Sequence, residues 1–151
     1  MFGYNILGFG STLANAGATA GFFATGGNTI TGAGVDLVHT FTASGTFAVV
    51  VGETVVDYLV IAGGASGSSH YVAGGGGAGG YRASFNSEAS GGGASSETGL
   101  TLGISSNTVT IGAGGAVPAS VTKGNNGADS VFATITSIGG GAGANRSTEA
   151  N

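Results

Sequence analysis

The sequence is poor in the residues on which many folds and active sites depend. Its 151 residues include no cysteine, no tryptophan, one methionine and one proline. Without cysteine, the chain can form neither a disulfide framework nor a thiolate metal site. With Pro118 as its single proline and no strict Gly-X-Y repeat, it cannot form a collagen triple helix.

Charged residues are also scarce. They make up 7% of the chain, with three bases against seven acids and a net charge of −4. A protein that binds a phosphate backbone needs several Lys or Arg contacts, and a membrane-surface helix needs a basic face. Because Arg82, Lys123 and Arg146 are few and scattered, we expect no nucleic-acid partner and no helix on a membrane surface.

The N-terminal stretch MFGYNILGFGSTLANAGATAGFF is apolar but has no Lys or Arg. A secretory signal peptide begins with a positively charged region, which this stretch lacks. Its glycines interrupt the apolar run too often for a transmembrane helix. We therefore expect neither a signal peptide nor membrane insertion.

Glycine, by contrast, is abundant. The chain has 34 glycines, about three times the usual share. Disordered chains are typically rich in charge and poor in apolar residues, whereas 41% of this chain is hydrophobic. We therefore expect it to fold or to assemble.

Short runs of β-branched and aromatic residues, separated by turn signals, predict β-strands. The runs at 37–42 and 46–51 predict one hairpin, and those at 100–104 and 107–111 predict another. The run at 55–62 is nearly all apolar and predicts a central strand with both faces covered, and 130–138 predicts a further strand. No helix longer than a turn is expected, so the fold class is all-β: a small antiparallel sandwich or barrel-like domain with glycine-rich loops.

We divide the chain into an extended N-terminal segment at 1–34, a glycine-rich β domain at 35–144 and a C-terminal tail at 145–151. Whether this sequence is a fragment of a longer chain is left open. Two interpretations of the N-terminal segment are equally favoured. It is an edge strand folded back on the β domain, or it docks on another subunit. The docking contacts would be its aromatic and aliphatic residues: Phe2, Tyr4, Ile6, Leu7, Phe9, Phe22 and Phe23.

The chemistry-bearing residues predict no active site. Gly74, Gly76 and Gly79 match G-x-G-x-x-G, but a dinucleotide site needs a helix at the motif, and Gly79-Gly80 would break one. His39 and His70 are the only imidazoles, too few for a zinc site. We expect His39 to be a partly exposed residue of a strand. We therefore predict a protein without catalytic residues, cofactor or metal.

The glycines themselves then need an explanation, above all the stretch GGGGAGGYR at 74–82. Without a Cβ atom, glycine backbones can approach one another closely. Extended three-fold glycine helices could pack side by side and bond through their N–H and C=O groups. The alternative is a flexible tether. The aromatic rings of Tyr71, Tyr81 and Phe85 favour a docked segment.

An ordered series of motifs supports a family resemblance. It runs from HTFTASGTF at 39–47 through VDYLVIAGG at 56–64 and GGGGAGGYR to VTIGAGG at 109–115 and NGADSVF at 126–132. Together these steps, over 37–144, resemble the glycine-rich β domain of bacteriophage tail-fibre and adhesin proteins.

The resemblance implies a non-enzymatic structural protein on the outer surface of a phage particle. Members are commonly trimeric, and their glycine-rich tip loops can recognise host surface structures, which makes His70, Tyr71 and Tyr81 candidate receptor contacts. We expect a short tail fibre or fibre-like appendage, a homotrimer that buries the apolar faces of the 35–62 strands between protomers. Its N-terminus would be attached to a tail, adaptor or capsid protein.

Two alternatives remain open. The first is a decoration protein or head fibre on the capsid surface, with the same β domain and a different docking partner. The second is a carbohydrate-binding module that uses His70, Tyr71 and Tyr81 to contact a glycan.

Overall fold

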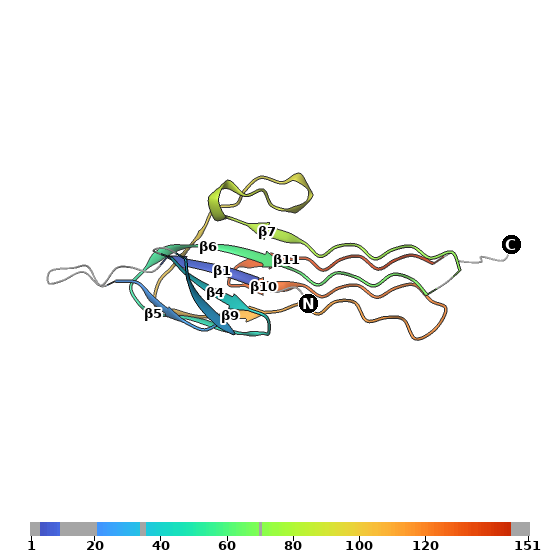
Figure 1. Cartoon of the computed structure of the whole chain (residues 1–151), viewed down its shortest axis with the longest axis horizontal. Helices are drawn as coiled ribbons and strands as arrows, with labels where there is room; N and C mark the ends of the chain where they lie inside the picture. Colours follow the sequence, from blue (N-terminus) through green and yellow to red (C-terminus); the bar gives the residue numbers. More distant parts are fainter. Residues whose placement is uncertain (1–3, 10–20, 34–35, 70, 146–151) are drawn as a thin grey trace.

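The computed structural model describes residues 4–9, 21–33, 36–69 and 71–145 (Figure 1). They form two antiparallel sheets, with an elongated stalk of extended chain projecting from one end (Figure 1). The prediction of an all-β fold is confirmed, and the sheets are not closed into a barrel. No helix in the described ranges is long and apolar enough to cross a membrane.

The first sheet is organised around a long central strand. Its order is β3 (Thr29–Ala33), β4 (Asp36–Phe41), β1 (Tyr4–Phe9), β6 (Thr54–Ile61) and β7 (Tyr81–Ala83). A further strand, β8 (Leu100–Leu102), pairs with the opposite end of β6 from β7. The predicted central position of the 55–62 strand is therefore confirmed. The prediction that both its faces are covered is wrong, because only alternate residues of β6 are buried and Val55 is 51% exposed.

In the described part of the chain, five strands form the second sheet. Its order is β11 (Ile135–Ser137), β10 (Ser130–Phe132), β9 (Ser105–Thr110), β5 (Gly45–Val51) and β2 (Phe23–Thr25). The predicted run at 130–138 is in fact a tight hairpin, because Ala133 between β10 and β11 has a positive φ of 50° and reverses the chain.

Both predicted hairpins are wrong, although their strands exist. β4 belongs to the first sheet and β5 to the second, and likewise β8 belongs to the first and β9 to the second. Each short connection crosses from one sheet to the other. The Ser and Gly residues in these connections indicate a chain reversal, but the same composition suits a turn within a sheet and a crossing between sheets.

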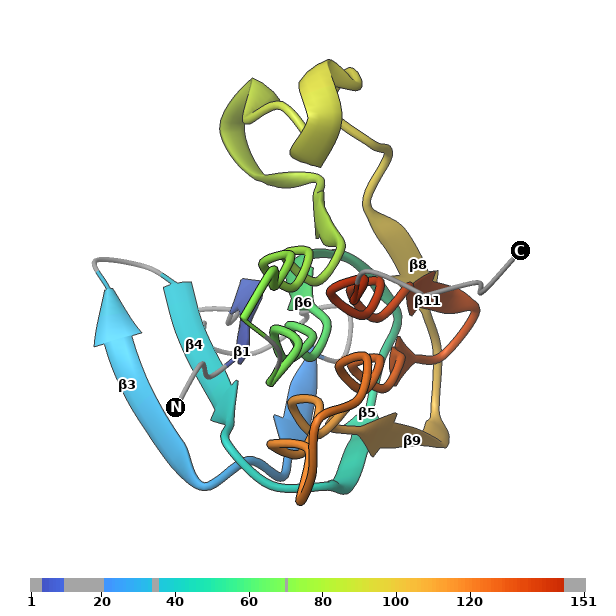
Figure 2. The same cartoon turned by 90° about the vertical axis from the view of Figure 1, so that its right-hand side faces the viewer.

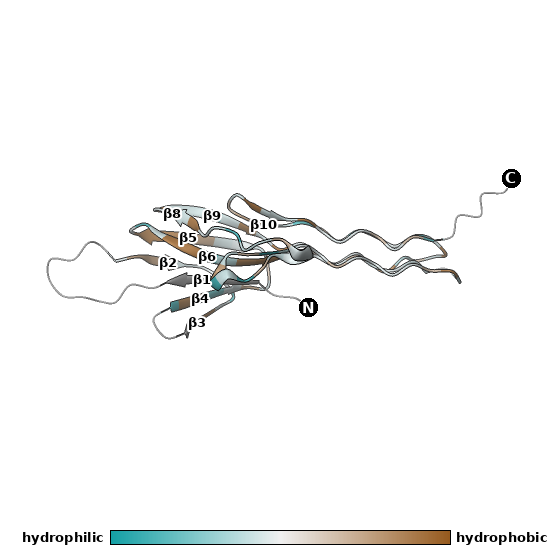
Figure 3. Cartoon of the chain, turned by 90° about the horizontal axis from the view of Figure 1, so that it is seen from above, coloured by the Kyte–Doolittle hydropathy of each residue, from teal (hydrophilic) through white to brown (hydrophobic). Residues whose placement is uncertain are grey.

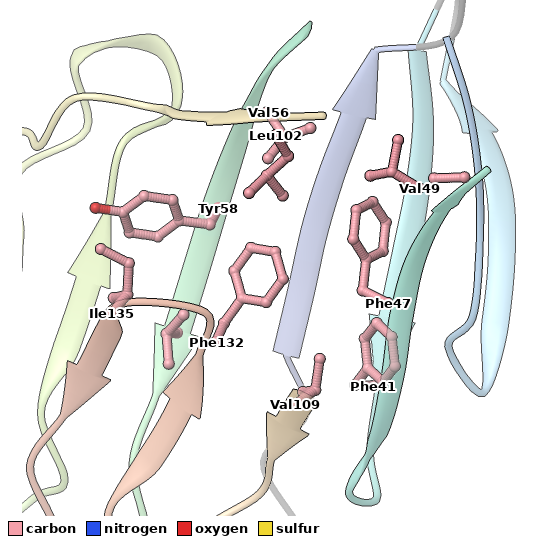
Figure 4. Close-up of a cluster of buried hydrophobic side chains, with 11 residues drawn as sticks. Phe41, Phe47, Val49, Val56, Tyr58, Leu102, Val109, Phe132 and Ile135 are labelled. Carbon is pink, nitrogen blue, oxygen red and sulfur yellow. The ribbon is translucent and has the colours of Figure 1, made fainter. Parts of the chain in front are cut away.

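The hydrophobic core fills the space between the two sheets (Figure 4). Alternate residues of β6 are buried, as the two-residue period of a strand requires. Phe47 is fully buried, and its ring meets that of Phe132 edge-to-face, with centroids 5.7 Å apart. The cluster comprises Ala24, Phe41, Phe47, Val49, Val56, Tyr58, Val60, Leu102, Val109, Phe132 and Ile135.

His39 lies in this interior and not at a partly exposed position as predicted. It is 2% exposed, and its ring meets that of Phe47 edge-to-face at 5.1 Å. Its Nδ1–H donates a hydrogen bond to the carbonyl of Gly26 (2.8 Å). The polar atom is thereby satisfied, which lets an imidazole occupy an apolar core.

The glycine-rich blocks form the stalk, which we define as five extended segments: 62–69, 74–80, 112–116, 122–128 and 138–144. Seen from the tip, the segments run side by side as small coils (Figure 2). The stalk is mostly pale on the hydropathy scale, whereas hydrophobic colour gathers in the strands (Figure 3). Its cohesion therefore needs a source other than an apolar core.

Backbone hydrogen bonds supply that cohesion. The first segment donates to the second at intervals of three residues: Ala62 to Gly80 (2.9 Å), Ala65 to Gly77 (2.9 Å) and Ser68 to Gly74 (3.0 Å). The next N–H in each triplet donates to the fourth segment: Gly63 to Ala128 (3.0 Å), Ser66 to Asn125 (3.0 Å) and Ser69 to Thr122 (3.2 Å). A three-residue period with bonds only between segments is the pattern of packed three-fold extended helices. The prediction of packed glycine helices is therefore confirmed, and the alternative of a flexible tether is wrong.

Close approach explains why these positions are glycine. A Cβ atom on Gly127 would lie 1.9 Å from the carbonyl oxygen of Gly63, and one on Gly79 would lie 2.1 Å from that of Ala62. Any side chain there would separate the segments and break their hydrogen bonds.

Candidate functional site

The three predicted receptor contacts do not form one site. Tyr71 lies at the far tip of the stalk, whereas Tyr81 begins β7 at its base. His70 lies outside the described residues. A single carbohydrate site built from all three residues is not what the chain presents, since the length of the stalk separates the two tyrosines (Figure 1).

The tip consists of two loops, one joining the first and second stalk segments and one joining the third and fourth. They are held together by polar contacts of two serines. Ser68 Oγ donates to the carbonyl of Thr122 (3.0 Å), and Ser69 Oγ donates to that of Ser120. The two loops therefore form one surface at the end of the stalk.

Exposed apolar side chains gather on this tip surface. Tyr71 is 98% exposed and Val117 is 84% exposed, and Val72 and Val121 are each more than half exposed. Scattered apolar residues are common on protein surfaces, but a group of them marks an interaction site. Tyr71 was predicted from the sequence but Val117 and Val121 were not, because nothing in the sequence indicates that the chain at 68–69 meets the chain at 120–122.

The docking residues predicted in the N-terminal segment lie in or beside strands where they are described. β1, which carries Tyr4, Ile6, Leu7 and Phe9, pairs with β4 on one side and β6 on the other. It therefore folds back on the β domain as predicted, but as an internal strand and not as an edge strand. Phe22 packs against the core and Phe23, on β2, is 51% exposed. Phe2 lies outside the described residues. Contact of this segment with another protein stays a prediction.

A polar network at the base of the stalk was not predicted. Arg82 and Glu97 form a two-point ion pair, in which Nε donates to Oε1 (2.8 Å) and Nη2 donates to Oε2 (2.6 Å). The buried Tyr58 hydroxyl donates to Glu97 Oε2 (2.7 Å), and Ser90 Oγ donates to Oε1 (3.1 Å). Arg82 and Glu97 are 15 positions apart, so the sequence does not indicate that they pair, although charged residues are scarce enough for each to stand out.

This network determines how Glu97 titrates. The pKa of Glu97 is lowered to about 2, mainly by the hydrogen bonds from Arg82. Partial burial acts in the opposite direction, and hydrogen bonds from Tyr58 and Ser90 lower the pKa further. Burial, together with the hydrogen bond to Glu97, raises the pKa of Tyr58. Glu97 therefore stays ionised and Tyr58 stays neutral near neutral pH. Among the described residues, no group of three His, Asp or Glu side chains is placed to hold a metal ion.

The Glu97 ion pair predicts a stability that falls in acid. Because the pKa is lower in the folded state than in the unfolded chain, the stabilisation is complete above about pH 4.5 and is lost as the pH falls toward 2. After allowance for partial exposure, we expect the loss to be about 1–2 kcal/mol. Urea unfolding between pH 7 and pH 2 measures it. Glu97→Gln should be less stable at pH 7 and should lose this part of the acid slope; an unchanged slope would contradict the assignment.

Comparison with known proteins gives one match. A family model described as a glycine-rich domain matches residues 40–151. Neither the curated proteins nor the solved structures give a match to this chain.

Proposed function

The chain belongs to the glycine-rich domain family, and we propose that it is a structural protein of a bacteriophage particle. In this proposal it is a non-enzymatic short tail fibre or fibre-like appendage on the outer surface of the particle. It holds the tip surface away from the particle so that the surface can contact a host cell.

The observation that carries the proposal is the combination of a stalk with an exposed tip. The stalk segments bond to one another mainly through backbone groups, with a few side-chain contacts such as that of Ser66 with Asn125. Its end bears Tyr71 and Val117 almost fully exposed. An extended spacer that ends in an apolar and aromatic surface is suited to reaching and binding another surface.

The family resemblance adds support because most of its motifs lie where a strand of the sandwich leads into the stalk or where the stalk returns to a strand. VDYLVIAGG spans the exit of β6 into the stalk, and GGGGAGGYR spans the return into β7. VTIGAGG spans the exit of β9, and NGADSVF spans the return into β10. Four of the five motifs that resemble phage fibre domains thus lie where strands join the stalk, and HTFTASGTF spans the crossing from β4 to β5.

The homotrimer remains part of the proposal, but its expected interface changes. The inner faces of β4, β5 and β6 are buried inside a single chain, so they cannot also pack between protomers. Exposed apolar side chains at the end of the sandwich away from the tip supply another surface for a protomer or a virion protein: Phe23, Val50, Val51, Val55 and Ile104.

Binding of the labelled chain to a panel of bacterial strains, measured by flow cytometry, tests the proposal. We expect the wild-type chain to label a subset of strains. The double variant Tyr71→Ala, Val117→Ser should lose about ten-fold or more in affinity, because it removes the central anchors of the tip surface.

The matched control is Ile30→Ser, which removes an exposed apolar side chain from the edge strand β3, outside both the tip and the proposed protomer surface. It should bind like wild type, and all three proteins should have the same Tm. Unchanged labelling by the tip variant would contradict the role of the tip. A chain that labels no strain would favour the capsid decoration protein, which has no need to contact a cell.

A further inference from the structure

We propose that a groove at the base of the stalk binds a neutral, hydroxyl-rich ligand, namely a stretch of uncharged glycan. The groove is separate from the tip surface, and its occupancy does not depend on the function proposed above.

The loop between β7 and β8 stands off the sandwich (Figures 1 and 2). A groove of about 630 Å³, partly open to solvent, lies beside this loop. Its lining includes 78–80, where the second stalk segment ends, 90–92 and 94 of the loop, and 136–138. An open groove of this size suits part of a chain-like ligand better than an enclosed small molecule.

The charge of the groove selects against ionised ligands. Arg82 and Glu97 both line it, and their two-point pairing leaves the site without net charge. A phosphate or carboxylate would have to compete with Glu97 for Arg82, and the low pKa of Glu97 keeps that competitor ionised. The ligand that fits best is therefore neutral.

The same pair still offers hydrogen bonds. The guanidinium group has five N–H donors, and three of them are used by Glu97 and by the carbonyl of Thr136 (3.0 Å). The two remaining donors have no partner among the described residues. Sugar hydroxyls can accept hydrogen bonds from these two donors in place of water.

Tyr81 provides an apolar face beside these polar groups. Its hydroxyl donates to Glu88, and its Cβ packs so closely on the loop that a Cβ atom on Gly91 would lie 3.0 Å from it. Because the Tyr81 side chain is held at its Cβ and at its hydroxyl, it loses little conformational entropy when its ring contacts the C–H face of a sugar. The bare glycine backbone around it lets a ligand approach the ring closely.

An array of neutral oligosaccharides, with heparin as an anionic comparison, tests the proposal on the full chain. We expect wild type to bind at least one neutral hexasaccharide and not to prefer heparin. Addition of that sugar should shift the NMR signals of the Gly79, Gly80 and Gly91 amides. Tyr81→Ala should bind about ten-fold more weakly, because the aromatic face is lost.

Ala94→Trp keeps the outcome interpretable if Tyr81→Ala fails to fold. Ala94 is exposed and lines the groove, so tryptophan there should fill it and abolish binding without touching the core. The matched control is Ala119→Trp, which places the same ring at the exposed tip and should bind the sugar normally. Absence of any neutral ligand, binding by Ala94→Trp equal to wild type, or loss of binding only in Ala119→Trp would each overturn the proposal.

Discussion

Replacing Gly127 with alanine is expected to separate the packed segments of the stalk while the sandwich stays folded. The new Cβ atom would lie 1.9 Å from the carbonyl oxygen of Gly63 and 2.5 Å from its carbonyl carbon. Both of those atoms are backbone, so no side-chain rotation can relieve the clash. The segments must separate, which breaks the bonds from Gly127 N–H to Gly140 (2.9 Å) and from Gly140 N–H to Gly63 (2.9 Å). The expected cost to the stalk is about 3 kcal/mol or more.

Amide hydrogen exchange measures this effect best, because it separates local opening from global unfolding. Protection should fall at stalk amides such as Ala65 and Gly77 and should stay unchanged in the centre of β6. The matched control is Gly141→Ala in the fifth stalk segment, where an added Cβ would meet nothing within 4 Å. That variant should stay within about 1 kcal/mol of wild type, on the stabilising side, because alanine restricts the unfolded chain. Equal effects at the two positions would rule out close backbone packing as the reason for glycine.

Val56→Asp is expected to unfold the sandwich itself. Val56 is 0% exposed and lies in the core cluster on the central strand β6. A carboxylate there has to lose its hydration, and no cation belongs to that cluster. The expected cost is about 3–5 kcal/mol, a large share of the 5–15 kcal/mol that stabilises a typical domain. Far-UV circular dichroism and thermal unfolding measure the loss.

The neighbouring residue gives the control for this variant. Val55 precedes Val56 on the same strand but faces outward and is 51% exposed. Val55→Asp introduces the same charge and the same loss of β propensity, and it should cost about 1 kcal/mol or less. Similar Tm values for the two variants would contradict the assignment of the inner and outer faces of β6.

The strands could be predicted from the sequence more readily than their partners. The runs at 37–42, 46–51 and 55–62 correspond to β4, β5 and β6, because β-branched and aromatic residues favour a pleated, half-buried chain. The assignment of β4 and β5 to different sheets could not be predicted. A short Ser and Gly connection reverses the chain in either case, and the choice between pairing and crossing depends on which other strands compete for the same edge.

The candidate sites show the same division. Tyr71 stood out in the sequence as an aromatic residue within a glycine block, but its neighbours on the tip come from a loop about 50 residues further along. Arg82 and Glu97 were visible as rare charges, yet only the packing of the β7–β8 loop beside β7 brings them together. Sequence spacing carries little information about contacts made across a loop.

By itself, the sequence determined the all-β class, the central place of the 55–62 strand and the use of glycine as packing material. Each of these follows from local chemistry: strand propensity, apolar patterning and the missing Cβ atom. Only the tertiary structure determined which stalk segments lie side by side. Most of their bonds join backbone N–H and C=O groups, which are the same at every residue. Only a few involve side chains, such as those from Asn125 N–H to Ser66 Oγ and from Ala142 N–H to Asn126 Oδ1. The two sheets specify most of the pairing, because they fix where each segment leaves the sandwich and where it returns.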